Sequence, residues 1–166
     1  MQDPPNGPGN DGRMSARRVL AVGLFLALFA QSAIAANLGE LNAIAARDRQ
    51  LDHAINALEA GRANPSPSAP QVLTSWQRLR RTAAALLTDA RALSGPPEAA
   101  RLQAVDLLSR ETRRIDLLIR MAHEESERNT TALSRDRNEL ARLVRGRNQS
   151  EATLRKMLDT LNSAPR

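Results

Sequence analysis

Residues 124–131 read EESERNTT, and this polar stretch decides between two architectures for the chain. It lies within a long segment, Glu98 to Arg145, that contains neither glycine nor proline. If a helix continues through the stretch, residues 97–162 form a single helix of roughly 100 Å. If the stretch forms a turn instead, four helices of similar length make a bundle.

Apolar residues on both sides of this stretch keep one seven-residue phase. Asn129 and Asp136 at d, and Arg147 at a, are expected to weaken such a seam while they specify its register. A helix that restarts after a turn keeps the phase in only about two of seven cases, so the phase favours one long helix. With Val105 at position a, the coiled-coil seam consists of Val105, Leu108, Ile115, Ile119, Leu133, Leu140, Leu143, Leu154, Met157 and Leu161.

The two architectures differ in what covers this seam. Beside a long helix, the shorter helices leave an apolar stripe uncovered, which predicts self-association or a second helical protein as partner. In a four-helix bundle the same residues form an internal core, and the chain is monomeric. The stripe in question consists of Leu133, Leu140, Leu143, Leu154, Met157 and Leu161.

Two shorter helices precede the long segment, and their apolar residues alternate at three- and four-residue spacing. The first is expected over Leu38 to Ala60, with Asp48 filling one seam position and Gly61 ending the helix. A Pro- and Ser-rich linker, Arg62 to Pro70, separates it from the second helix. The short connection Ser94 to Pro97 joins the second helix to the long segment, and so short a connection makes the two flanking helices antiparallel neighbours. The seam residues are Leu41, Ile44, Leu51, Ile55 and Leu58, then Val72, Trp76, Leu79, Ala83, Leu86, Ala90 and Leu93.

The segment before these helices reads as an export signal. Arg17 and Arg18 precede an apolar run that starts at Val19 and ends in small residues. This order predicts a signal peptide, and the alternative is an uncleaved transmembrane anchor over residues 17–36 that would itself contact the membrane. In both cases the later residues lie outside the cytoplasm, in the periplasm of a bacterium or facing it from the inner membrane. The residues at the cleavage site are Ala33, Ala35 and Ala36.

The predicted domains are a disordered extension and basic n-region over 1–16, the signal or anchor over 17–36, and an extracytoplasmic helical domain over 37–166. The predicted fold class is all-α: an N-terminal signal or anchor helix, an antiparallel helical hairpin and a long coiled-coil helix. The four-helix bundle is the alternative.

Composition narrows the chemistry further. The aromatic content is only 2% and cysteine is absent, so the core is aliphatic and no disulfide or thiol-attached haem is expected. The two histidines, His53 and His123, lack the spacing of a metal site. No nucleophile–base pair or phosphate-binding glycine loop occurs. We therefore expect no enzymatic activity, no metal and no cofactor.

The chain is basic, with a formal net charge of +6. Local excesses of arginine indicate either contact with anionic lipid or an acidic partner, or simply a solvated surface. Export makes nucleic acid the poorest of the candidate partners. The arginines concerned are Arg78, Arg80, Arg81, Arg113, Arg114, Arg142, Arg145 and Arg147.

These features predict a non-enzymatic, exported or membrane-tethered coiled-coil protein that acts as a scaffold or accessory subunit of a cell-envelope assembly. The alternative is a periplasmic helical-bundle sensor or ligand-binding domain. A third function, an Arg-rich nucleic-acid binder, is possible only if residues 17–36 are not an export signal.

Overall fold

The computed structural model contains four helices, α1 (Gly12–Gly61), α2 (Ala69–Ala92), α3 (Glu98–Ser126) and α4 (Thr130–Ser163). It describes the backbone of residues 12–61, 69–94 and 97–164, and the side chains of residues 37–61, 70–94 and 97–164. No strand occurs in these ranges. The predicted all-α class is confirmed.

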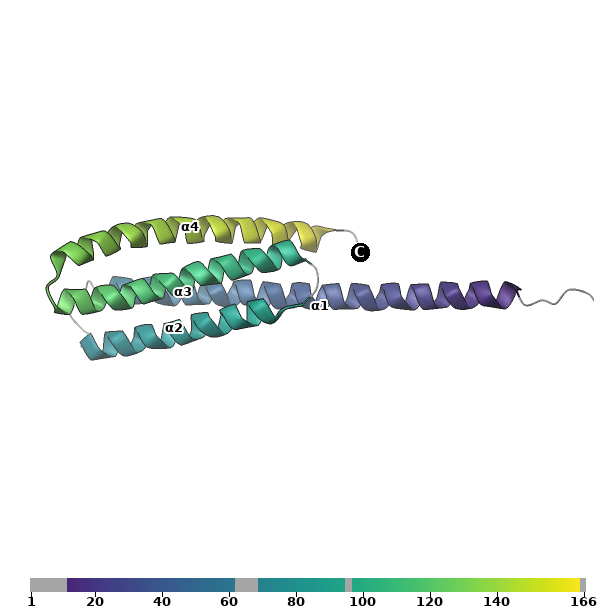
Figure 1. Ribbon diagram of the computed structural model, residues 1–166, viewed down its shortest axis with the longest axis horizontal. Coiled ribbons are helices and arrows are strands. Elements are labelled where there is room, and N and C mark those ends of the chain that lie inside the picture. The colour runs from purple at the N-terminus through teal and green to yellow at the C-terminus, as the bar shows by residue number, and fades with distance from the viewer. Residues whose placement is uncertain (1–11, 62–68, 95–96, 165–166) are drawn as a thin grey trace, which may run out of the picture.

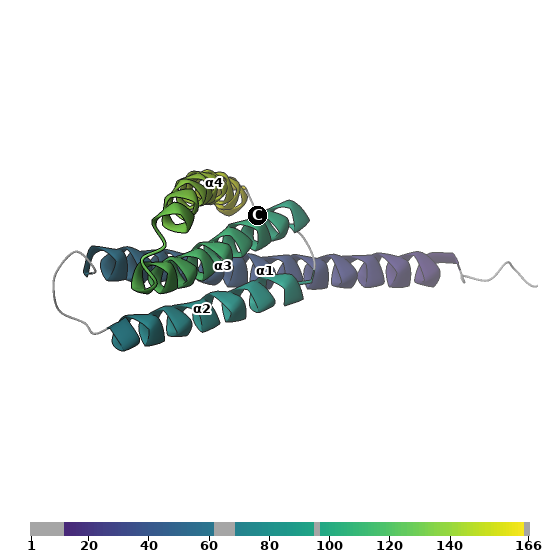
Figure 2. The same cartoon turned by 60° about the vertical axis from the view of Figure 1, so that its left-hand side comes forward.

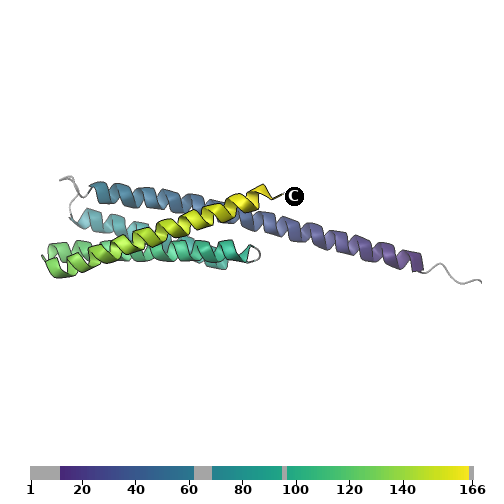
Figure 3. The same ribbon diagram turned by 90° about the horizontal axis from the view of Figure 1, so that it is seen from above.

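The C-terminal part of α1 packs with α2, α3 and α4 in a bundle, while the N-terminal part continues beyond it as a single helix (Figures 1 and 3). Helix α3 contacts all three other helices, and α2 and α4 do not contact each other within the described ranges. Contacts between α1 and α4 are the sparsest of the pairs that touch, and Figure 2 shows α4 standing apart from α1. Among the helix pairs that touch, α1 and α4 therefore have the least extensive interface.

The predicted long helix over 97–162 is wrong, because the chain turns between α3 and α4, as the bundle alternative requires. Arg128 adopts the left-handed conformation, with φ of 57°. The Asn129 side chain caps α4 by accepting a hydrogen bond from the Ala132 backbone N–H at 3.2 Å. The heptad positions before and after the turn share one phase, and in both helices these positions face the same core. The shared phase therefore does not distinguish one continuous helix from two.

We expect Arg128→Gly to raise the free energy of unfolding by about 1 kcal/mol, because glycine adopts positive φ without the Cβ clash. Chemical denaturation of the full-length chain measures the change. Arg128→Ala is the matched control and should be nearly neutral, since alanine keeps the Cβ. Equal effects of the two substitutions would contradict the backbone explanation.

The core is aliphatic and lies within one chain. The seam residues predicted for the first two helices are buried or partly buried, and Trp76 is completely buried. In α3 and α4, the seam residues buried in the same core are Leu108, Ile115 and Leu154, and those packed against it are Val105, Ile119, Leu140, Met157 and Leu161. Leu133 and Leu143 are also partly buried.

This packing corrects the expectation of an uncovered apolar stripe. Every residue of that stripe is buried or partly buried in the folded chain. Among the described side chains, the only large hydrophobic residue classed as exposed is Leu102, at 52%. The stripe therefore gives no reason to expect a partner helix.

The predicted export signal cannot be followed at the level of side chains. Helix α1 runs without a break through residues 17–36, but Ala33, Ala35 and Ala36 lie outside the ranges whose side chains are described. No helix in the part of the chain that was searched, the described residues, is both long and apolar enough to cross a membrane.

Candidate functional site

A buried arginine of α4 joins three helices in the centre of the bundle. Arg147 is only 2% exposed, and its guanidinium donates to Asp48 Oδ2 of α1 at 2.8 Å and to Glu111 Oε2 of α3 at 3.2 Å. It also donates to Glu151 Oε2, one turn along α4, at 2.5 Å. Arg147 thus links α1 to α4 where those two helices otherwise make few contacts.

A second buried arginine, Arg114 of α3, extends the arrangement along α1. Its guanidinium donates to Asp52 Oδ1 at 2.7 Å, to Asn56 Oδ1 at 2.7 Å and to Glu59 Oε2 at 2.6 Å. Asp52 also lies 3.7 Å from Arg147. The two arginines therefore belong to one network, which we call the core charge cluster: Asp48, Asp52, Glu59, Glu111, Arg114, Arg147 and Glu151.

The core charge cluster contains more acids than bases. Its five carboxylates face two guanidinium groups, so full ionisation leaves a formal charge of −3. Asp48 Oδ1 and Glu111 Oε1 are buried and accept no hydrogen bond. A buried carboxylate whose charge is only partly compensated is destabilised relative to its neutral form.

The two most buried carboxyl groups of the core charge cluster have raised pKa values. Burial raises the pKa of Asp48 to about 6, against the opposing effect of Arg147. Burial likewise raises the pKa of Glu111 to about 7, with Arg147 and Arg114 acting in the opposite direction. Both pKa values therefore lie much closer to neutrality than those of ordinary carboxyl groups.

A second set of ion pairs holds α3 to α4 near the turn. Asp136 is buried and accepts from Arg120 of α3. Glu139 of α4 accepts from Arg113 at 2.6 Å and lies 3.7 Å from Arg120. These pairs are more exposed on the arginine side and join two helices that already pack extensively, so we assign them a structural role.

The arginines predicted to contact an anionic partner differ in their burial and in their ion-pair partners. Arg114 and Arg147 are buried against carboxylates of their own chain, so neither is accessible to an anionic partner. Arg80 pairs with Asp116, and Arg113 pairs with Glu139. The remaining four are exposed but are divided between α2 and α4, which do not touch: Arg78, Arg81, Arg142 and Arg145.

The histidines do not contribute to a site. His53 and His123 are both exposed, on α1 and α3. Within the described residues, no group of three or more histidine, aspartate or glutamate side chains is arranged to hold a metal ion.

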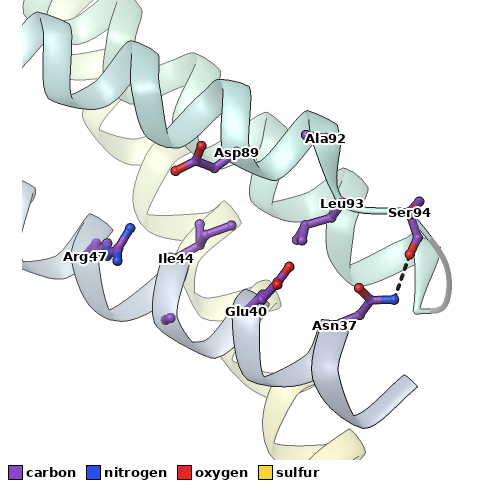
Figure 4. Close-up of a pocket in the computed structure, with 9 residues that line it drawn as sticks. Asn37, Glu40, Ile44, Arg47, Asp89, Ala92, Leu93 and Ser94 are labelled. Carbon is purple, nitrogen blue, oxygen red and sulfur yellow. Dashed lines mark hydrogen bonds between the residues drawn. The ribbon is translucent and has the colours of Figure 1, made fainter. Parts of the chain in front are cut away.

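Grooves flank α1 in the described part of the chain, and two of them lie beside its charged residues. The larger, of about 550 Å³, lies between α1 and the end of α2 and is open to solvent (Figure 4). Glu40 and Arg47 line it from α1, Asp89 lines it from α2, and Asn37 Nδ2 donates to the Ser94 carbonyl at 2.7 Å across one end. The smaller, of about 180 Å³, lies between α1 and α4 and reaches Asp48 and Glu151 of the core charge cluster.

Comparison with known proteins identifies no relative: no protein-family model, no curated protein and no solved structure matches this chain. The assignment of a function therefore depends on the geometry described above.

The cluster itself escaped prediction from the sequence, although its main members were noticed. Asp48 and Arg147 both occupy positions where the heptad pattern calls for an apolar residue. Charged residues at seam positions of two different helices are the signal that a buried pair could have been sought.

Proposed function

We propose that this chain is an exported, non-enzymatic four-helix-bundle domain that works as a sensor or ligand-binding domain. The observation that carries the proposal is the core charge cluster, which joins α1 to α3 and, across the least extensive helix interface, to α4. The strength of this junction depends on the charge of its carboxyls, and so on protons or ligands that reach them.

A sensor needs an element whose two arrangements differ by only a few kcal/mol, so that a bound proton or ligand shifts the balance. Helix α1 fits this requirement because ion pairs, rather than extensive apolar contact, connect it to α4. It also continues beyond the bundle toward the predicted leader (Figure 1). If the leader is retained as an anchor, a shift of α1 would pass directly to the membrane.

The scaffold function, by contrast, was expected because an apolar seam would need another chain to cover it. The residues of that seam are buried or partly buried in the described part of the bundle, which weakens this argument for a scaffold. A scaffold would therefore have to assemble through a different surface.

Two measurements test the exported bundle. Cell fractionation with sequencing of the mature N-terminus should place the protein outside the cytoplasm. Sedimentation should give a compact monomer, whereas an elongated oligomer would favour the scaffold function. A cytosolic protein whose DNA affinity falls steeply with salt would favour the nucleic-acid binder instead.

A third measurement tests the sensor itself. The chain has no native cysteine, so Ala57→Cys in α1 and Ala141→Cys in α4, both at exposed positions, accept spin labels selectively. We expect the distance distribution between them to change between about pH 8 and pH 5, across the pKa values of the buried carboxyls. A matched pair in α3 and α4, Ala99→Cys and Ala152→Cys, should change less, because apolar contact holds those helices together. An unchanged α1–α4 distance would contradict a sensor that works through α1.

A further inference from the structure

The groove between α1 and α4 combines an apolar surface with an acidic end. Leu107 of α3, with Leu154 and Leu158 of α4, lines the groove with aliphatic carbon. The helices are antiparallel, as the contacts of Asn42 with Asn162 and of Asp48 with Arg147 show. Asp48 and Glu151 therefore occupy one end of the groove.

Asp48 at this end has one buried oxygen without a donor, because Arg147 donates to its Oδ2 but not to its Oδ1. Asp48 is only 1% exposed, it lines the groove, and its Oδ1 makes no hydrogen bond. Glu151, whose side chain is 34% exposed, accepts from Arg147 through Oε2 and lines the same groove. Both carboxylates belong to a cluster that is short of positive charge, so a donor that is also a cation would satisfy the end of the groove.

We propose that this groove binds a small organic cation, with a primary ammonium group between Asp48 and Glu151 and a short apolar chain against Leu107, Leu154 and Leu158. The proposal rests on the proposed sensor or ligand-binding function and names the class of ligand. An ammonium group has three hydrogen-bond donors and a compact charge, which suits two carboxylates that Arg147 already holds near each other through one oxygen of each.

The other groups around the groove are compatible with this ligand. Arg49 and Arg155 also line it, but both are exposed, so their long side chains can turn into solvent, where their charges are screened. Asp159 adds a further carboxylate toward the other end. The volume of about 180 Å³ limits the ligand to a molecule much smaller than a typical drug.

Calorimetric titration of the full-length chain with n-butylammonium tests the proposal. n-Butanol is the neutral control and butyrate the anionic control, since both keep the apolar chain. For so few atoms we expect a Kd of about 1 mM for the ammonium, and no saturable binding of the other two. Methyl resonances of Leu107, Leu154 and Leu158 should shift with the ammonium alone.

Binding should also release protons near pH 6. The groups that face Asp48 are Arg147 and Glu151 of α4, Glu111 of α3 and Asp52 of α1. The bound cation favours the ionised form of Asp48, so the measured heat should vary with the ionisation enthalpy of the buffer. Binding of n-butanol as tight as that of the ammonium, or the absence of any saturable signal, would overturn the proposal.

Two variants locate the site. Asp48→Asn and Glu151→Gln should each weaken the ammonium by about tenfold or more, since each removes a charge-assisted acceptor. Asp89→Asn, in the groove between α1 and the end of α2, is the matched control and should leave the affinity unchanged. If Asp48→Asn fails to fold, the half-buried Glu151→Gln decides, and unchanged affinity there would reject this site. The pH-dependent movement of α1 does not depend on ammonium binding and should be observed even if this site is rejected. The two measurements therefore distinguish a failure of this proposal from a failure of the sensor function.

Discussion

Replacing Arg147 with methionine should lower the free energy of unfolding by about 3–5 kcal/mol near pH 8. Methionine fills a similar volume but leaves Asp48 and Glu111 buried without their shared guanidinium, so that near pH 8 each must stay ionised unpaired or take up a proton, and both cost stability. Removing one partner of a buried ion pair is far more destabilising than removing the whole pair, because the remaining charge has lost its water and its partner. We therefore expect this exchange to have the largest effect of any single charge change in the bundle.

The loss should shrink by half or more near pH 5, where Asp48 and Glu111 bind protons and no longer need a counter-charge. Urea denaturation followed by circular dichroism at both pH values measures it. Arg142→Met, at an exposed position of the same helix, is the control and should change stability by no more than about 0.5 kcal/mol. Equal losses at both pH values would mean that Arg147 acts by packing and not by charge.

The wild-type chain should become more stable as the pH falls from about 8 to about 5, by roughly 3 kcal/mol. The folded-state pKa values of Asp48 and Glu111, about 6 and about 7, exceed the unfolded values. The folded state therefore holds more protons than the unfolded state in this window. The stabilisation is complete below the unfolded pKa values and is lost as the pH rises through the folded ones.

A series of urea midpoints at constant ionic strength checks this pH dependence. Glu111→Gln is the diagnostic variant, because glutamine resembles the protonated acid, and it should flatten the profile and raise stability near pH 8. At lower pH the trend reverses for Asp106, because the hydrogen bond from Arg110 lowers the pKa of that carboxyl. A wild-type stability that falls steadily from pH 8 to pH 5 would contradict the raised pKa values of the cluster.

Heptad spacing predicted which residues are buried far better than where a helix ends. The residues predicted for the seam over α1 and α2 are buried or partly buried, with Ile55 and Trp76 completely buried. The same spacing led to the wrong long helix, because two antiparallel neighbours that share a core can keep a common phase. The local signals of the turn were present at Arg128 and Asn129, where a polar stretch offered an N-cap and nothing apolar to bury.

The sequence by itself determined the all-helical class, the faces of the helices and the end of α1 at Gly61, because each depends on residues within a few turns of one another. Only the tertiary structure decided what the charged seam positions do. Asp48 and Arg147 are 99 residues apart, and their hydrogen bond exists because α1 and α4 are antiparallel and aligned at that level. Register between helices is set by packing of the whole bundle, and no local pattern records it.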